Sequence, residues 1–186
     1  PFYLGRAFKE ASSGRKGAVH LSIPVDVFGA STEAPSALPM PFTDAVCAPG
    51  SREIGDALAL LKSAERPIII AGSGLWWGEA VAELQAFIEK ANLPLYTITM
   101  ARGVVPDSHP LCFGYGDPAL NYAVHTSFKE ADVILMLGKR IDYRMALGGP
   151  RLFSPQTRFI QVAIHPQELG LNRKLDVAIC ADVKAT

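Results

Sequence analysis

The fold of this chain is decided by a short apolar run and the glycine turn that follows it, Arg66-Pro67-Ile68-Ile69-Ile70-Ala71-Gly72-Ser73-Gly74. Three consecutive isoleucines between a proline and a glycine are typical of a strand that is buried on both faces of a sheet. Glycines directly after such a strand allow a tight turn into a helix. The stretch therefore predicts one strand-turn-helix unit of a parallel sheet.

The same alternation continues to the end of the sequence. Further strands are expected at residues 95–99, 133–137, 159–164 and 177–180. Apolar residues at helical spacing predict helices that follow Ser51, that cover residues 80–91, and that run from Asp117 to about Phe128. Strands separated by helices favour parallel pairing with right-handed crossovers. We therefore predict an α/β fold with a doubly wound, mostly parallel Rossmann-like sheet and helices on both faces.

The first 50 residues differ from this pattern. Residues 1–30 contain an apolar helical stripe and then an alternating, half-buried strand at residues 18–23. One helix and one strand cannot bury their apolar faces against each other alone, so we expect this piece to pack against a partner. Four prolines at residues 31–50 predict a linker, and residues 51–186 are then the main domain.

Composition excludes several classes of function. The formal net charge is zero, so neither nucleic acid nor a membrane is an expected partner. No apolar run is long enough for a bilayer span and the N-terminus has no signal pattern, which favours a cytoplasmic protein. The first residue is not methionine, so we expect a piece cut from a longer chain. Three widely spaced cysteines indicate buried free thiols rather than a metal site or a disulfide framework.

Ligands of such sheets lie outside the carboxyl ends of the strands, where the strand order reverses. Gly72, Ser73 and Gly74 follow a strand there and could hold a phosphate; the alternative is a tight strand-to-helix turn without a ligand. Their GxGxxxG spacing is one residue longer than the dinucleotide fingerprint. The next strand ends in Thr99 and Met100 rather than in the carboxylate that would hold a nicotinamide ribose. A free-standing NAD-dependent oxidoreductase is therefore disfavoured.

A second candidate segment carries four charges after the strand at residues 133–137. Arg140 could clamp a phosphate with two hydrogen bonds and Asp142 could orient it; the alternative is a solvated loop with an internal Arg–Asp pair. The four histidines lie in separate segments, and no hydrolase, metalloprotease or Walker motif is present. We therefore expect no catalytic residue and no metal ligand in this sequence.

Six segments in series resemble the thiamine-diphosphate-dependent enzymes. Residues 14–27 are similar to the GRPGPVxxxIPxDV segment that closes their pyrimidine-binding domain, with Lys16 and Ala18 in place of prolines. Residues 66–74 resemble the opening strand and turn of their central domain, and residues 102–110 resemble K/RGxxPxxHP. Residues 138–142, 164–170 and 181–183 resemble GxRxD, IDPxEIG and GDV. The nearest group looks like the acetolactate synthases, 2-hydroxyacyl-CoA lyases and oxalyl-CoA decarboxylases.

The resemblance implies a central domain joined to the end of a pyrimidine-binding domain. In the parent enzyme, thiamine diphosphate and magnesium are held by other domains, and this piece is inactive alone. Its partners are the missing pyrimidine and pyrophosphate domains, in a homo-oligomer. Central domains of this family bind FAD, ADP or CoA, or are empty. The positions that match their nucleotide-contacting segments are Gly72, Ser73, Gly74, Thr99, Met100, Arg140, Asp142, Ile164, His165, Asp182 and Val183. His165 replaces the carboxylate that holds an adenosine ribose, so we expect weak ADP-like binding and no retained flavin.

Overall fold

The computed structural model describes residues 2–34 and 45–186. The chain divides into two compact units, residues 1–45 and residues 46–186, and each is described by itself. Most of the predicted linker at residues 31–50 falls on residues 35–44, which lie outside the described residues.

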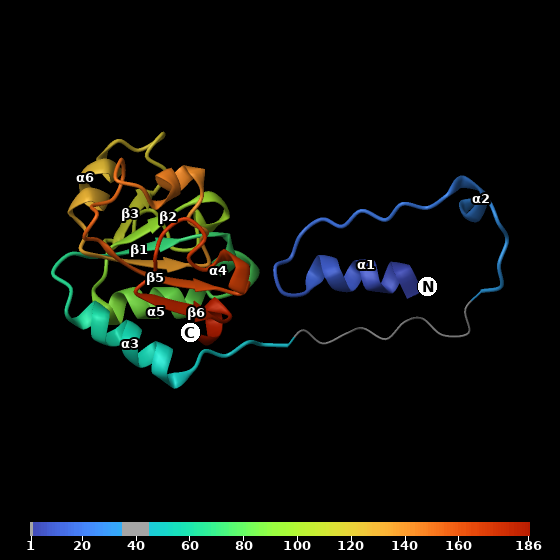
Figure 1. Cartoon of the computed structure of the whole chain (residues 1–186), viewed down its shortest axis with the longest axis horizontal. Coiled ribbons are helices and arrows are strands. Elements are labelled where there is room, and N and C mark those ends of the chain that lie inside the picture. Colours follow the sequence, from blue (N-terminus) through green and yellow to red (C-terminus); the bar gives the residue numbers. More distant parts are fainter. Residues whose placement is uncertain (1, 35–44) are drawn as a thin grey trace. The chain divides into compact units, whose positions relative to one another are not determined.

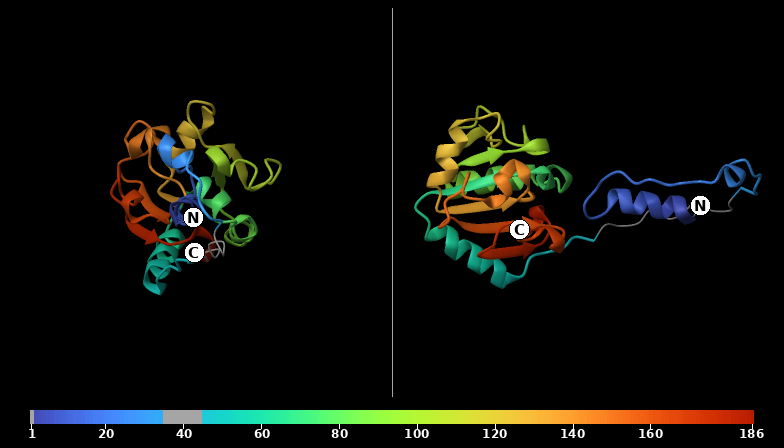
Figure 2. Two further views of the ribbon diagram at one scale, coloured as in Figure 1. Left: turned by 90° about the vertical axis from the view of Figure 1, so that its right-hand side faces the viewer. Right: turned by 45° about the horizontal axis from the view of Figure 1, so that its top comes forward.

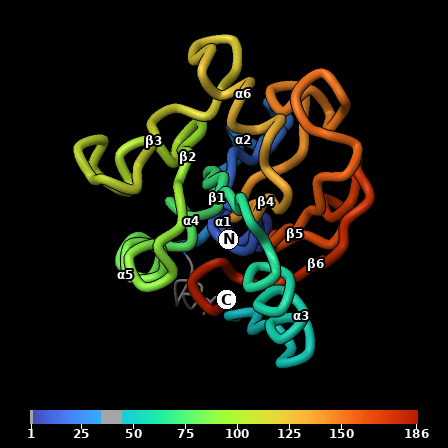
Figure 3. Tube along the Cα trace, turned by 90° about the vertical axis from the view of Figure 1, so that its left-hand side faces the viewer, coloured from blue at the N-terminus to red at the C-terminus, as the bar shows by residue number. Residues whose placement is uncertain are grey.

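The second unit is built on one six-stranded sheet (Figure 1). Its strands are β1 (Pro67–Ala71), β2 (Leu95–Thr97), β3 (Cys112–Tyr115), β4 (Val133–Leu137), β5 (Arg158–Ala163) and β6 (Val177–Cys180). Every pair is parallel, and the order is β3-β2-β1-β4-β5-β6, which Figure 3 shows from one side. The order reverses between β1 and β4. The predicted doubly wound parallel sheet is confirmed.

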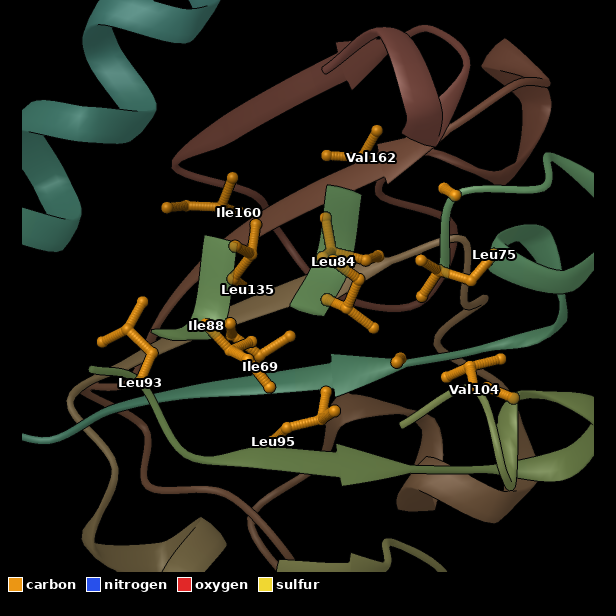
Figure 4. Close-up of a cluster of buried hydrophobic side chains, with 14 of the residues drawn as sticks. Ile69, Leu75, Leu84, Ile88, Leu93, Leu95, Val104, Leu135, Ile160 and Val162 are labelled. Atoms are coloured by element: carbon orange, nitrogen blue, oxygen red, sulfur yellow. The ribbon is translucent and has the colours of Figure 1, made fainter. Parts of the chain in front are cut away.

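Helices cover both faces of this sheet (Figure 1, Figure 2). On one face, α3 (Ser51–Lys62), α4 (Ser73–Trp77) and α5 (Val81–Ala91) pack over a cluster of buried aliphatic side chains. Figure 4 shows Leu84 and Ile88 of α5 beside Ile69, Leu135 and Ile160 of the strands. On the other face, α6 (Ala123–Glu130) buries Phe128 among aromatic and aliphatic residues. The continuous apolar runs of β1 and β4 thus result from burial on both faces.

Short 3-10 turns follow four of the strands at the carboxyl edge. They are η1 (Thr99–Ala101), η2 (Tyr143–Gly148), η3 (Pro166–Glu168) and η4 (Val183–Ala185). Together with α4 they form the edge of the sheet where ligands of this fold class bind.

Two elements of the second unit differ from the predictions. Strand β3 was not expected, because Cys112-Phe113-Gly114-Tyr115 has no continuous apolar run and pairs only with β2 at the edge of the described sheet. The helix predicted to start at Asp117 begins at Ala123 instead. The carboxylate of Asp117 accepts a hydrogen bond from the Ala119 amide, 3.0 Å away, and so caps a turn rather than the helix.

The first unit contains α1 (Phe2–Ser12) and the short α2 (Val25–Phe28). The strand predicted at residues 18–23 is wrong: these residues have no regular secondary structure and are exposed. No described residue of α1 is buried either. A strand needs a neighbour for its backbone hydrogen bonds, and among residues 2–34 the structure describes no strand that could pair with it.

Candidate functional site

The turns after β1 and β4 meet at the point where the strand order reverses. The Gly72 amide donates to the Leu137 carbonyl at 2.9 Å, and the Gly74 amide donates to the Gly138 carbonyl at 3.0 Å. A Cβ on Gly74 would lie 2.6 Å from the Gly138 Cα, and Gly138 itself has a φ of +59°. Glycine is therefore required here by the close approach of two backbones. The amides of Gly72 and Gly74 serve this contact, while Ser73 begins α4 beside them.

A buried ion pair holds the turn after β4. Lys139 is only 5% exposed, and its Nζ lies 2.5 Å from Oδ2 of Asp142. The other carboxylate oxygen of Asp142 accepts from the Arg144 amide at 3.1 Å. Burial lowers the pKa of Lys139 below its ordinary value, although the Asp142 carboxylate opposes this shift. The predicted alternative of an ion pair between Arg140 and Asp142 is therefore wrong. Asp142 pairs with Lys139, and Arg140 pairs with Glu168.

Arg140 points into a more open environment than its neighbours. Its side chain is 49% exposed, and its Nε lies 3.7 Å from Oε1 of Glu168 in η3. The next residue, Ile141, is 1% exposed and anchors the turn in the core. A guanidinium with one long ion pair keeps capacity for further acceptors, because it carries five N–H donors. The Arg140–Glu168 contact also links the turns after β4 and β5, where Ile164 and the partly buried His165 lie.

The turn after β2 contributes a strained residue and an exposed apolar side chain. Thr99 has a φ of +56°, and its amide donates to the Tyr115 hydroxyl at 3.4 Å. Met100 is 46% exposed, and η1 contacts α4, where Trp76 and Trp77 are also exposed. Large apolar side chains are thus presented to solvent on the β2 side of the reversal point.

The last two predicted positions lie away from this point, because β6 is two strands beyond β4. Asp182 binds the segment before α3: its Oδ2 accepts from the Cys47 amide at 2.7 Å, and its own amide donates to the Cys47 carbonyl at 2.8 Å. Val183 lines an apolar cleft of about 350 Å³ between α3 and α5, together with Leu61 and Leu84. The structure therefore does not bring Asp182 and Val183 together with Arg140.

Sequence reasoning missed a second ion pair at this edge. Arg144 Nη1 lies 2.7 Å from Oδ2 of Asp117, which is only 3% exposed, and this contact raises the pKa of Arg144. It joins η2 to the loop after β3. The sequence predicted Asp117 only as the start of a helix, and its partner 27 residues away could not be read from local patterns.

Comparison with known proteins identifies the domain. The family described as "Thiamine pyrophosphate enzyme, central domain" matches residues 54–186. The chain belongs to the thiamine pyrophosphate enzymes. The resemblance inferred from the sequence motifs is thereby confirmed, and residues 54–186 are a central domain of this family.

Relatives of this central domain support the assignment. Acetolactate synthase of Mycobacterium bovis is 36% identical over 187 residues, which are 100% of this chain and 30% of that protein. Oxalyl-CoA decarboxylase of Escherichia coli K12 is 34% identical over 98% of this chain and 32% of its own length. Benzoylformate decarboxylase from Polynucleobacter necessarius has the same fold, with a TM-score of 0.75 at 20% identity, over 98% of this chain and 34% of that one. The chain thus spans about a third of the length of these relatives.

Metal-ligating side chains do not gather in the part of this central domain that the structure describes. In proteins, magnesium that accompanies a diphosphate is held by carboxylate and other oxygen ligands. Among the described residues, no group of three His, Cys, Asp or Glu side chains could hold a metal ion.

None of the helices that the structure describes is long and apolar enough to cross a membrane.

Proposed function

We propose that this chain is the central domain of a thiamine-diphosphate-dependent carboligase or decarboxylase, inactive on its own, that weakly binds the diphosphate of an adenine nucleotide at its carboxyl edge. Its working partners are the pyrimidine and pyrophosphate domains of the parent enzyme, which we expect to be a homo-oligomer. Identities of 36% and 34% to an acetolactate synthase and an oxalyl-CoA decarboxylase support this class of parent.

One observation carries the nucleotide proposal: the exposed guanidinium of Arg140 lies directly after the strand at which the sheet order reverses. The buried Lys139 and Ile141 on either side hold the backbone of this turn in place. A charge-assisted hydrogen bond from a guanidinium to a phosphate contributes roughly 1.5–3 kcal/mol, and the planar group can make two. A diphosphate bound to Arg140 would compete with the 3.7 Å contact to Glu168.

The proposal assigns different roles to the other predicted residues. Ser73 at the start of α4 lies on the diphosphate side, and the exposed Met100 offers an apolar surface to an adenine ring. Gly72, Gly74 and Asp142 act indirectly, because they shape the two turns that place Arg140. Ile164 and His165 lie on the ribose side, where the histidine cannot accept two hydroxyl protons as a carboxylate does. We therefore expect dissociation constants of roughly tens of micromolar or weaker.

A second candidate function is purely architectural, with no ligand in this domain. The backbone contact between Gly74 and Gly138 favours it, since that contact alone explains the glycines of the turn. A direct measurement of nucleotide binding distinguishes the two candidate functions.

Isothermal titration calorimetry with ADP, CoA, FAD and NAD tests the proposal. We expect weak binding of ADP and CoA, no retained flavin and no binding of NAD. Arg140→Ala is expected to weaken ADP binding about tenfold or more, since tenfold corresponds to about 1.4 kcal/mol. Arg158→Ala, at the amino end of β5 and thus at the opposite edge of the sheet, is the matched control and should leave the affinity unchanged. Absence of heat for every nucleotide would establish the architectural alternative.

A further inference from the structure

Two cysteines 133 residues apart in the sequence lie beside each other at the edge of the sheet formed by β6. The Cys47 thiol donates to the Cys180 carbonyl oxygen, with the sulfur 3.3 Å from the oxygen. The backbone of Cys47 is fixed by its two hydrogen bonds with Asp182, at 2.7 and 2.8 Å. The segment before α3 is therefore attached to the end of β6 by three contacts, two of which involve backbone amides.

Both thiols are accessible. Cys47 and Cys180 are exposed, whereas Cys112 is only partly exposed, so the expectation of buried thiols is wrong for these two residues. Cys180 ends an edge strand and Cys47 belongs to the segment before α3. A small oxidant can therefore reach both sulfurs.

The two residues lie within the range in which a disulfide can form. Standard bond lengths place the Cys47 sulfur within about 6 Å of the Cys180 Cα, given its 3.3 Å contact to the carbonyl oxygen. Because a cysteine sulfur lies about 2.8 Å from its own Cα, the two Cα atoms are within about 8.5 Å, a range that includes the roughly 4.4–6.8 Å typical of disulfides. The Cys180 thiol now faces the Ile164 carbonyl at 3.7 Å, so the bond requires a rotation of this side chain about χ1. The two thiol hydrogen bonds that are lost are weak.

We propose that Cys47 and Cys180 are a modification site that forms an intramolecular disulfide with a low-molecular-weight disulfide such as oxidised glutathione. One cysteine thiolate attacks the oxidant, forms a mixed disulfide and releases one glutathione thiol. The second cysteine thiolate attacks the protein sulfur of the mixed disulfide and releases the second glutathione. Two protein thiols are oxidised to one disulfide, and one glutathione disulfide is reduced to two thiols.

The disulfide would close a ring that contains α3 and all six strands, because Cys47 precedes the first of these elements and Cys180 ends the last. A cross-link that closes a long loop restricts the unfolded chain most strongly. We expect the oxidised protein to melt roughly 5–15 °C above the reduced protein. The proposal is independent of nucleotide binding.

Peptide mapping of the 186-residue chain tests the site. The chain, at low micromolar concentration, is incubated with oxidised glutathione. It is then alkylated and digested with trypsin without reduction. The three cysteines fall on separate tryptic peptides, residues 17–52, 103–129 and 175–184. Mass spectrometry is expected to find peptide 17–52 linked to peptide 175–184, in protein that runs as a monomer on a non-reducing gel.

Variants separate this site from general thiol oxidation. Cys112→Ser should retain both the linked peptides and the rise in melting temperature, whereas Cys47→Ser and Cys180→Ser should lose both. Separate glutathione adducts on Cys47 and Cys180 without linkage, or a covalent dimer in place of the internal bond, would overturn the proposal. So would a linked pair that includes Cys112 in the wild-type chain.

Discussion

Gly74 is the residue at which the two central turns touch, so its substitution measures how much that contact matters. In Gly74→Ala the added Cβ would meet the backbone of Gly138 at 2.6 Å, and the turns must move apart. We expect the free energy of unfolding to fall by about 1–3 kcal/mol. Gly55→Ala is the matched control: this glycine lies in α3, with no described atom within 4 Å of the added Cβ. It should stabilise the chain by about 0.5–1 kcal/mol. Urea denaturation compares the two variants, and equal stability would contradict the tight contact.

Asp132 couples stability to pH through the turn that leads into β1. Burial alone would raise the pKa of Asp132. The amides of Glu65 and Arg66, which donate to its carboxylate at 2.8 and 2.9 Å, have the opposite effect and outweigh burial, so the pKa lies below its ordinary value of 3.8. Because the pKa of Asp132 is lower in the folded chain than in the unfolded chain, its carboxylate stabilises the fold at pH values above the unfolded-state pKa. This stabilisation is lost as the pH falls through the folded-state pKa.

Asp132→Asn is therefore expected to lower the free energy of unfolding by about 1 kcal/mol at pH 7, with the difference shrinking below about pH 4. Asp56→Asn serves as the control. Asp56 is 62% exposed, lies 3.8 Å from Arg52 on α3, and should change stability by less than about 0.5 kcal/mol. Denaturation curves at pH 3 to 7 test this, and a difference that is constant over the range would refute the assignment.

Single residues also show what the sequence could and could not predict about the site. Arg140 was predictable, because a charged residue directly after a buried strand must lie at the carboxyl edge. Its ion pair with Glu168 was not, because that contact depends on where the turn after β5 folds. Likewise, the sequence suggested that Asp142 could pair with an arginine. The buried Lys139 takes that place, since a buried charge must have a partner.

At the scale of elements, the segment at residues 18–23 tests whether the first unit is complete. Val19, Leu21 and Ile23 alternate as in a strand, but they are exposed and no described strand pairs with them. We expect their amides to exchange with deuterium without protection in the dilute chain, while those of Ile69 and Ile70 in β1 are strongly protected. Hydrogen exchange by NMR measures both sets in one sample. Strong protection at residues 18–23 in a monomer would mean that this unit has its own partner.

The elements that were predicted correctly share a physical cause. Strands β1 and β4 are buried on both faces, and such burial demands continuous apolar runs that can be read directly from the sequence. Strand β3 has three partly buried residues and one exposed residue, includes a glycine with a φ of +87°, and pairs with a register shift. Its extended conformation follows from the docking of its neighbour β2 rather than from its own residues, which is why local patterns did not reveal it.

For the molecule as a whole, we expect no turnover of pyruvate, oxalyl-CoA or a 2-hydroxyacyl-CoA with added thiamine diphosphate and magnesium. The described residues contain no cluster of metal ligands, and the chain spans about 30% of its acetolactate synthase relative. Product detection by mass spectrometry is the measurement, with a full-length acetolactate synthase as the positive control. Product formed at a rate proportional to the concentration of this chain would show that it contains a catalytic site.

The strand order has a consequence for how the second unit assembles. Strands β1 to β3 occupy residues 67–115 and strands β4 to β6 occupy residues 133–180, and each set forms one contiguous half of the sheet. The halves are joined in the sheet by the single seam between β1 and β4, whose register extends from Pro67 opposite Val133 to Ala71 opposite Leu137. During synthesis on the ribosome, β1 therefore remains without one neighbour until more than sixty further residues have emerged. Its isoleucine-rich edge is the surface that a nascent chain would have to shield from aggregation.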